Sequence, residues 1–246
     1  MTEETNNPIE RREPGGGIGR RSDIARRDMT AASYVSGLAA RQEANLQQTS
    51  TEYTYEFLRS WGTYGDGDGE FYSPDGLALD REANVYVSDW GNHRIQVFDS
   101  EGRFLRKWGT IGSGDGEFIG PHGLAFDGED NVYVTDWGNR RIQVFDPEGR
   151  FLRKWGSEEV GDGEFAYPRG IALDGEGRVY VVDYYNHRIQ VFDPEGRFLC
   201  KWGTQGVGDG EFSYPGEIAV GGEGCVYVAD SGNRRIQGFK RVLVNS

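Results

Sequence analysis

A repeat of fixed length dominates the sequence. Trp61, Trp108, Trp155 and Trp202 are each followed by glycine, and successive tryptophans are 47 residues apart. A constant period of this length is typical of folds in which near-identical units stack on one another. The chain is therefore expected to fold as a row of similar units and not around one irregular core.

Each copy of the repeat contains signals for four short β-strands with turns between them. The third strand is the RIQVF segment, and the fourth, RFLRKW, ends on the repeated tryptophan. The first strands are expected at 76–79, 123–126, 170–173 and 217–220, and the second at 85–87, 132–134, 179–181 and 226–228. Asp, Gly and Pro in the turns favour hairpins. This pattern predicts the all-β class, as a four-bladed β-propeller.

The ends of the repeat array suggest how a ring closes. Residues 55–61 match a lone fourth strand, and the last copy stops after its third strand at 235–239. We expect 55–61 to pair with that last blade, which would close the ring and cover an exposed strand edge. Two alternatives remain: two chains share strands in an eight-bladed ring, or a partner completes an open arc.

Charge is distributed unevenly along the chain. The net charge is −13, and because acidic and basic residues balance over 1–50, the repeats carry all of it. Such a surface repels phosphate backbones and anionic lipid, so nucleic acid and membrane insertion are not expected. The two cysteines, Cys200 and Cys225, form no metal or disulfide framework. Without an apolar segment long enough for a signal or a membrane span, we expect a cytoplasmic protein.

The motifs of the repeat carry a family resemblance. PxGLAxD, NVYVxD, GNHRIQVFD or GNRRIQVFD, and GRFLRKWG recur in phase over residues 53–239. They resemble NHL repeats, a family of sensor, scaffold and RNA-binding propellers that is more distantly similar to propeller lyases and lactonases. Members more often have six blades, so a ring of four implies a narrower central channel.

Some polar residues recur in every copy, which indicates a structural role. An aspartate ends the second strand (Asp89, Asp136, Asp183, Asp230), an arginine begins the third (Arg94, Arg141, Arg188, Arg235), and an asparagine precedes it (Asn92, Asn139, Asn186, Asn233). We expect a buried Asp–Arg pair, with the asparagine in a left-handed turn. Because equivalent copies cannot play different catalytic roles, no catalytic residue is predicted. The GDGE loops lack the ligand spacing of a calcium site.

Residues that break the repeat are the candidates for binding. One set lies where the innermost strands begin and is expected to converge on the channel mouth: Asp75, His122, Arg169 and Glu217. It could hold a small anion, a metal or a peptide end, although Arg169 is a poor neighbour for a cation. A second set follows the strand-ending aspartates on the same face: Trp90, Trp137, Tyr184, Tyr185, Arg140, His187 and Arg234. Exposed aromatics beside cations predict a protein-binding surface.

We therefore predict an extension over residues 1–51 and a propeller over 52–246. The extension is expected to be disordered at first, helical within 22–48, and to act as a docking arm. The predicted function is a non-enzymatic protein-interaction module, a scaffold or accessory subunit with protein partners and no cofactor or metal. The alternatives are an RNA-binding propeller and a small-molecule or metal-dependent enzyme of the lyase or lactonase type.

Overall fold

The computed structural model describes residues 54–158 and 160–242. The chain divides into two units, residues 1–58 and 59–246, and every strand lies in the second. The predicted extension over residues 1–51 lies outside the described residues, so its disorder and helix stay predictions. Among the described residues each helix is a single 3-10 turn, and none is long and apolar enough to cross a membrane.

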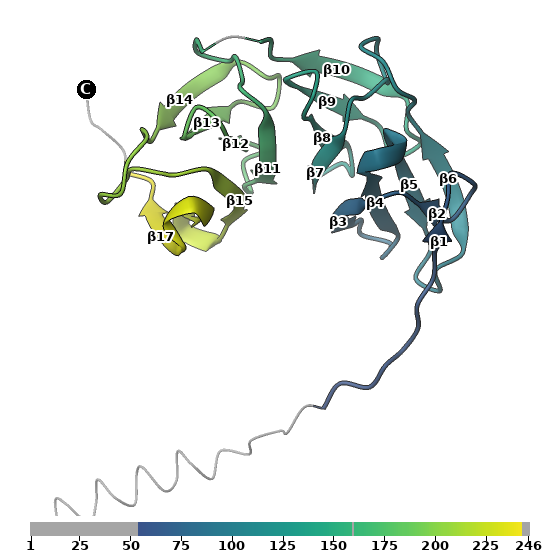
Figure 1. The fold of residues 1–246 in the computed structure, drawn as a ribbon. Coiled ribbons are helices and arrows are strands. Elements are labelled where there is room, and N and C mark those ends of the chain that lie inside the picture. The colour runs from purple at the N-terminus through teal and green to yellow at the C-terminus, as the bar shows by residue number, and fades with distance from the viewer. Residues whose placement is uncertain (1–53, 159, 243–246) are drawn as a thin grey trace, which may run out of the picture. The chain divides into compact units, whose positions relative to one another are not determined.

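The predicted blades are confirmed, with three four-stranded sheets and one of three strands. In each, consecutive strands pair antiparallel, as their tight turns require. Figure 1 shows the blades following one another, with β3, β7, β11 and β15 innermost. Blade 1 contains β3 (Pro74–Leu79), β4 (Val85–Asp89), β5 (Arg94–Phe98) and β6 (Phe104–Trp108). Blade 2 contains β7 (Pro121–Phe126), β8 (Val132–Asp136), β9 (Arg141–Phe145) and β10 (Phe151–Trp155).

The remaining blades repeat this order. Blade 3 contains β11 (Pro168–Leu173), β12 (Val179–Asp183), β13 (Arg188–Phe192) and β14 (Phe198–Trp202). Blade 4 contains β15 (Pro215–Val220), β16 (Cys225–Asp230) and β17 (Arg235–Lys240). The first strand of each blade begins two residues before the predicted start, at the proline. Elements that the repeat pattern did not predict are β1 (Thr63–Tyr64), β2 (Glu70–Phe71), and the 3-10 turns η1 (Trp90–Asn92), η2 (Gly222–Gly224) and η3 (Ser231–Asn233).

The core lies between the blades, because alternate side chains of a strand point to opposite faces of its sheet. We call the face of a blade that packs on the next blade its trailing face, and the opposite one its leading face. Tyr86 and Ile95 on the trailing face of blade 1 are fully buried with Val132, Val134 and Phe145 of blade 2. Clusters of the same kind join blade 2 to blade 3 and blade 3 to blade 4.

Inner strands approach one another most closely where glycines replace side chains. A Cβ on Gly123 would lie 2.6 Å from the carbonyl oxygen of Arg169 in blade 3. Gly76 and Gly170 face the next blade in the same way. In blade 4 the corresponding residue is Glu217, so its inner strand is not shaped for an equally close neighbour.

The predicted closure by residues 55–61 is wrong for this structure. Residues 54–62 form no strand, and the fourth sheet ends at β17 with three strands. β1 and β17 lie at opposite ends of the row of blades (Figure 1). Trp61 instead packs on blade 1, with its ring centroid 6.0 Å from that of Phe98.

Candidate interaction face

A buried polar network fixes the loops that carry the candidate site. Asp136 is fully buried, and its carboxylate accepts hydrogen bonds from Arg141 Nε at 2.8 Å and Asn139 Nδ2 at 2.9 Å. Gln143 Nε2 donates to the same carboxylate at 3.1 Å, and the Ile119 amide donates to its other oxygen at 2.9 Å. The predicted Asp–Arg pair is confirmed in every blade. A charge buried this deeply needs such complete pairing.

The arginine of each pair also anchors the GDGE loop. Arg141 Nη2 donates to the carbonyl oxygens of Gly114 at 2.7 Å and Glu117 at 2.8 Å. The Glu117 carboxylate accepts a hydrogen bond from the Gly114 amide at 2.7 Å. The loop is therefore held by its own acid and by the buried arginine, which accounts for the repeated motif.

The left-handed residue of the turn is not the asparagine that the sequence suggested. The residue after it adopts this conformation instead, with φ of 56° at His93, 54° at Arg140, 51° at His187 and 55° at Arg234. The asparagine amide is committed elsewhere: Asn139 Nδ2 donates to Asp136 and to the Gly112 carbonyl oxygen. The variable residue is thus set at a fixed backbone angle on the loop.

The aromatic part of the predicted face comes together. The ring centroid of Trp137 lies 5.4 Å from Tyr184, 6.3 Å from Tyr185 and 5.1 Å from His122. Trp90 is 6.4 Å from His122 on the other side. Trp90 and Tyr185 are 40% and 50% exposed, whereas Trp137 and Tyr184 are half-buried. The first two are thus the open contacts of this aromatic row, and the other two support them.

Sequence reasoning missed two tyrosines that extend the row. Tyr167 lies 5.0 Å from Trp137, and Tyr214 lies 5.3 Å from Tyr184, between ring centroids. Both occupy the position directly before the proline of the innermost strand, where the other blades have Ser73 and Gly120. This position breaks the repeat as much as the one after the proline, so the same search could have found them.

The three cations predicted for this face differ in their surroundings. Arg140 lies over the Tyr167 ring, 4.5 Å from its centroid, and pairs with Glu158. His187 is buried, and its Nδ1 accepts a hydrogen bond from the Tyr214 amide at 3.0 Å. Arg234 is exposed. His187 therefore supports the face, Arg140 is half-buried against Tyr167, and Arg234 is the exposed cation.

The predicted channel-mouth residues contact one another as two pairs, each of one acidic and one basic side chain. His122 Nδ1 contacts the Asp75 carboxylate, and Arg169 Nε lies 4.0 Å from Glu217 Oε1. Burial lowers the pKa of His122 even though Asp75 opposes the shift. Desolvation by the surrounding inner strands raises the pKa of Glu217, with Arg169 opposing and Asp75 adding to it. Across residues 54–158 and 160–242, no three His, Cys, Asp or Glu side chains gather as metal ligands.

A pH dependence of stability follows from His187. Desolvation lowers its pKa below the ordinary 6.5, against the raising effect of Asp183 and Asp230. The unfolded chain therefore binds the proton first, and the free energy of unfolding falls as the pH drops below 6.5. His187→Asn keeps a hydrogen-bond acceptor and tolerates the left-handed backbone. Urea unfolding from neutral to mildly acid pH should show a flatter dependence in this variant; an unchanged slope would contradict the assignment.

Comparison with known proteins identifies the family of the repeat. The NHL repeat matches residues 71–98, 118–145 and 165–192, which run from the residue after the GDGE loop to the end of the third strand in blades 1, 2 and 3. Blades 1, 2 and 3 of this protein contain NHL repeats. The B-box type zinc finger protein ncl-1 of Caenorhabditis elegans is 46% identical over 43 residues, or 18% of this chain and 5% of that protein. Protein brain tumor of Drosophila melanogaster is 44% identical over 43 residues, covering 18% of this chain and 4% of its own.

Solved structures agree on the fold of the NHL repeats. Virginiamycin B lyase from Staphylococcus aureus matches with a TM-score of 0.51 at 13% identity, over 70% of this chain and 56% of its own. A Bacteroides thetaiotaomicron protein of unknown function matches with a TM-score of 0.57 at 22% identity, over 67% and 46%. The chain thus spans about half of these structures and a small part of the curated relatives.

Proposed function

We propose that this NHL-repeat protein is a non-enzymatic protein-interaction module whose partner binds the aromatic row and its flanking cations. The observation that carries the proposal is the row of packed aromatic rings with exposed Trp90 and Tyr185, beside Arg140, on loops held by buried ion pairs. Rings and guanidinium groups on rigid supports are the residues that dominate binding energy at protein interfaces.

The pairing of charged side chains at the channel mouth favours a binding role over an enzymatic one. Asp75 and Glu217 each already face a base from the neighbouring blade. Glu217 has a raised pKa, and its ion-pair partner is Arg169. The mouth therefore contributes polar complementarity at the centre of the face, while the aromatic row contributes contact area. A cytoplasmic location and docking through residues 1–50 remain predictions.

The test compares a face variant with a matched surface variant. The full chain is used to capture partners from its native source, beside Trp90→Ala/Tyr185→Ala and beside Leu152→Ala, which alters an exposed leucine on the outer strand β10. We expect the double variant to lose the partner, with each anchor worth about 2 kcal/mol or more in binding to the purified partner. Leu152→Ala should bind like the parent chain.

A truncated chain separates the face from the arm. If removal of residues 1–50 abolishes binding while Trp90→Ala/Tyr185→Ala leaves it intact, the arm carries the interaction and the proposed face is wrong. Capture of RNA in place of protein, with an affinity that falls steeply with salt, would overturn the proposal in favour of a nucleic-acid partner.

A further inference from the structure

The two ends of the row of blades expose halves of a junction that is buried elsewhere. On the trailing face of blade 4, Tyr227 is 51% exposed and Ile236 is 67% exposed. The equivalent Tyr180 and Ile189 of blade 3 are 4% and 0% exposed, because blade 4 covers them. An apolar face built in the pattern of an internal junction is thus left uncovered at this end.

The opposite end shows the complementary half. On the leading face of blade 1, Leu77 is 68% exposed and Leu79 is 60% exposed. The equivalent residues of blade 2, Leu124 and Phe126, are half-buried and pack in the cluster between blades 1 and 2. The leading face of blade 1 therefore exposes the kind of apolar side chains that a trailing face buries at the internal junctions. The trailing face of blade 4 could cover them in the same way.

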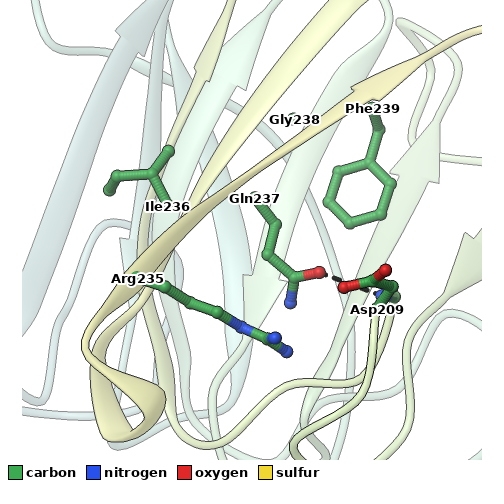
Figure 2. A pocket seen from close by; sticks show the side chains of 7 residues that line it. Asp209, Arg235, Ile236, Gln237, Gly238 and Phe239 are labelled. Atoms are coloured by element: carbon green, nitrogen blue, oxygen red, sulfur yellow. Dashed lines mark hydrogen bonds between the residues drawn. The ribbon is translucent and has the colours of Figure 1, made fainter.

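The free edge of β17 carries a groove where blades 1 to 3 hold their fourth strand. It measures about 400 Å³ and is lined by Asp209, Gly210 and residues 235–239 (Figure 2). In blade 1 the corresponding edge is covered by β6, with Lys107 opposite Gln96 and paired with Asp68 at 2.6 Å. The groove of blade 4 is therefore the seat of a missing strand.

Residues 59–61 already make the contacts of such a strand, but with the blade at the other end. Arg59 Nη1 donates to the Ser100 carbonyl oxygen at 3.1 Å, as Arg153 Nη2 does to the Pro194 carbonyl oxygen at 2.6 Å. Trp61 packs on Phe98 and lies over Gly102, as Trp108 packs on Phe145 and lies over Gly149. These residues thus occupy the place of the fourth strand of a blade preceding blade 1.

We infer that a second copy of this chain supplies that preceding blade. Its blade 4 has the three strands that are missing in front of blade 1, and it lacks the fourth strand, whose place residues 59–61 take. The copies associate head to tail: β17 of one copy pairs with residues 55–61 of the other, and Tyr227 and Ile236 cover Leu77 and Leu79. Addition of a strand to a free sheet edge is an established mode of protein association.

The arrangement of the blades favours a second copy over closure within one chain. The row of blades places β17 and β1 at opposite ends (Figure 1). Glu217 also stands where Gly76, Gly123 and Gly170 let the inner strands touch. The junction between two copies is therefore made by the outer strands and the apolar faces. Its inner strands lie farther apart than those of the three junctions within one chain.

Sedimentation velocity of the full chain over a wide range of protein concentration tests this association. We expect a dimer or a larger head-to-tail assembly. Ile236→Asp and Leu77→Asp should each yield monomer, because each places a charge in one half of the junction. Leu152→Asp, which charges an exposed leucine outside both halves, should assemble like the parent chain. Circular dichroism establishes that each variant is folded.

Mixing the two defective variants shows whether the contact is head to tail. The intact leading face of Ile236→Asp and the intact trailing face of Leu77→Asp can still form one junction, so the mixture should contain a heterodimer that neither variant forms with itself. A folded parent chain that stays monomeric throughout would overturn the proposal in favour of closure within one chain. Loss of assembly in Leu152→Asp, or no heterodimer in the mixture, would also overturn it.

Discussion

Asp136→Ala is expected to lower the free energy of unfolding by about 3–5 kcal/mol, because it leaves a buried guanidinium group without its counter-charge. The Arg141 side chain is only 7% exposed, so water cannot replace the lost carboxylate. The variant also removes the acceptor for Asn139, Gln143 and the Ile119 amide. Urea unfolding followed by tryptophan fluorescence measures the loss.

Asp230→Ala is the matched control for this prediction. It breaks the same pair in blade 4, but the Arg235 side chain is 29% exposed and can be solvated once the carboxylate is removed. The loss of stability should therefore be smaller than in Asp136→Ala. Equal losses in both variants would mean that burial of the arginine does not determine how much the free energy of unfolding falls.

The strands and the Asp–Arg pairs could be predicted from the sequence because the information for them is local and repeated. Turn residues such as those at 146–149 mark the strand ends in each copy, and the alternation between them assigns the faces. The left-handed position could not be assigned in this way. Asparagine is the usual residue for it, but the amide of Asn139 is required by Asp136, so Arg140 takes the strained angle.

Ring closure depends on information that no local pattern contains. Residues 55–61 read as a fourth strand, and Arg59 and Trp61 do make the interblade contacts of one. Whether β17 pairs with them depends on how far four blades turn around the axis, which is set by packing at three junctions together. The same limit applies to Tyr167 and Tyr214, whose side chains join the aromatic row only once adjacent blades are in place.

The second large effect is expected from Gly123→Ala, with a loss of about 1–3 kcal/mol in the free energy of unfolding. The added methyl group would lie 2.6 Å from the Arg169 carbonyl oxygen, and this oxygen belongs to the backbone of an inner strand that cannot rotate away. Relief of the clash requires blades 2 and 3 to move apart, which loosens the buried cluster of Tyr133, Ile142 and Val181.

Gly175→Ala separates this clash from the general effect of replacing glycine. A Cβ at Gly175 would meet nothing within 4 Å, and its backbone does not require positive φ. This variant should be neutral, within about 0.5 kcal/mol, in the same urea titration. If Gly123→Ala proved equally neutral, the inner strands would have to lie farther apart than the structure places them. Glu217, at the same position of blade 4, would then no longer distinguish the uncovered face of that blade from the three junctions between blades.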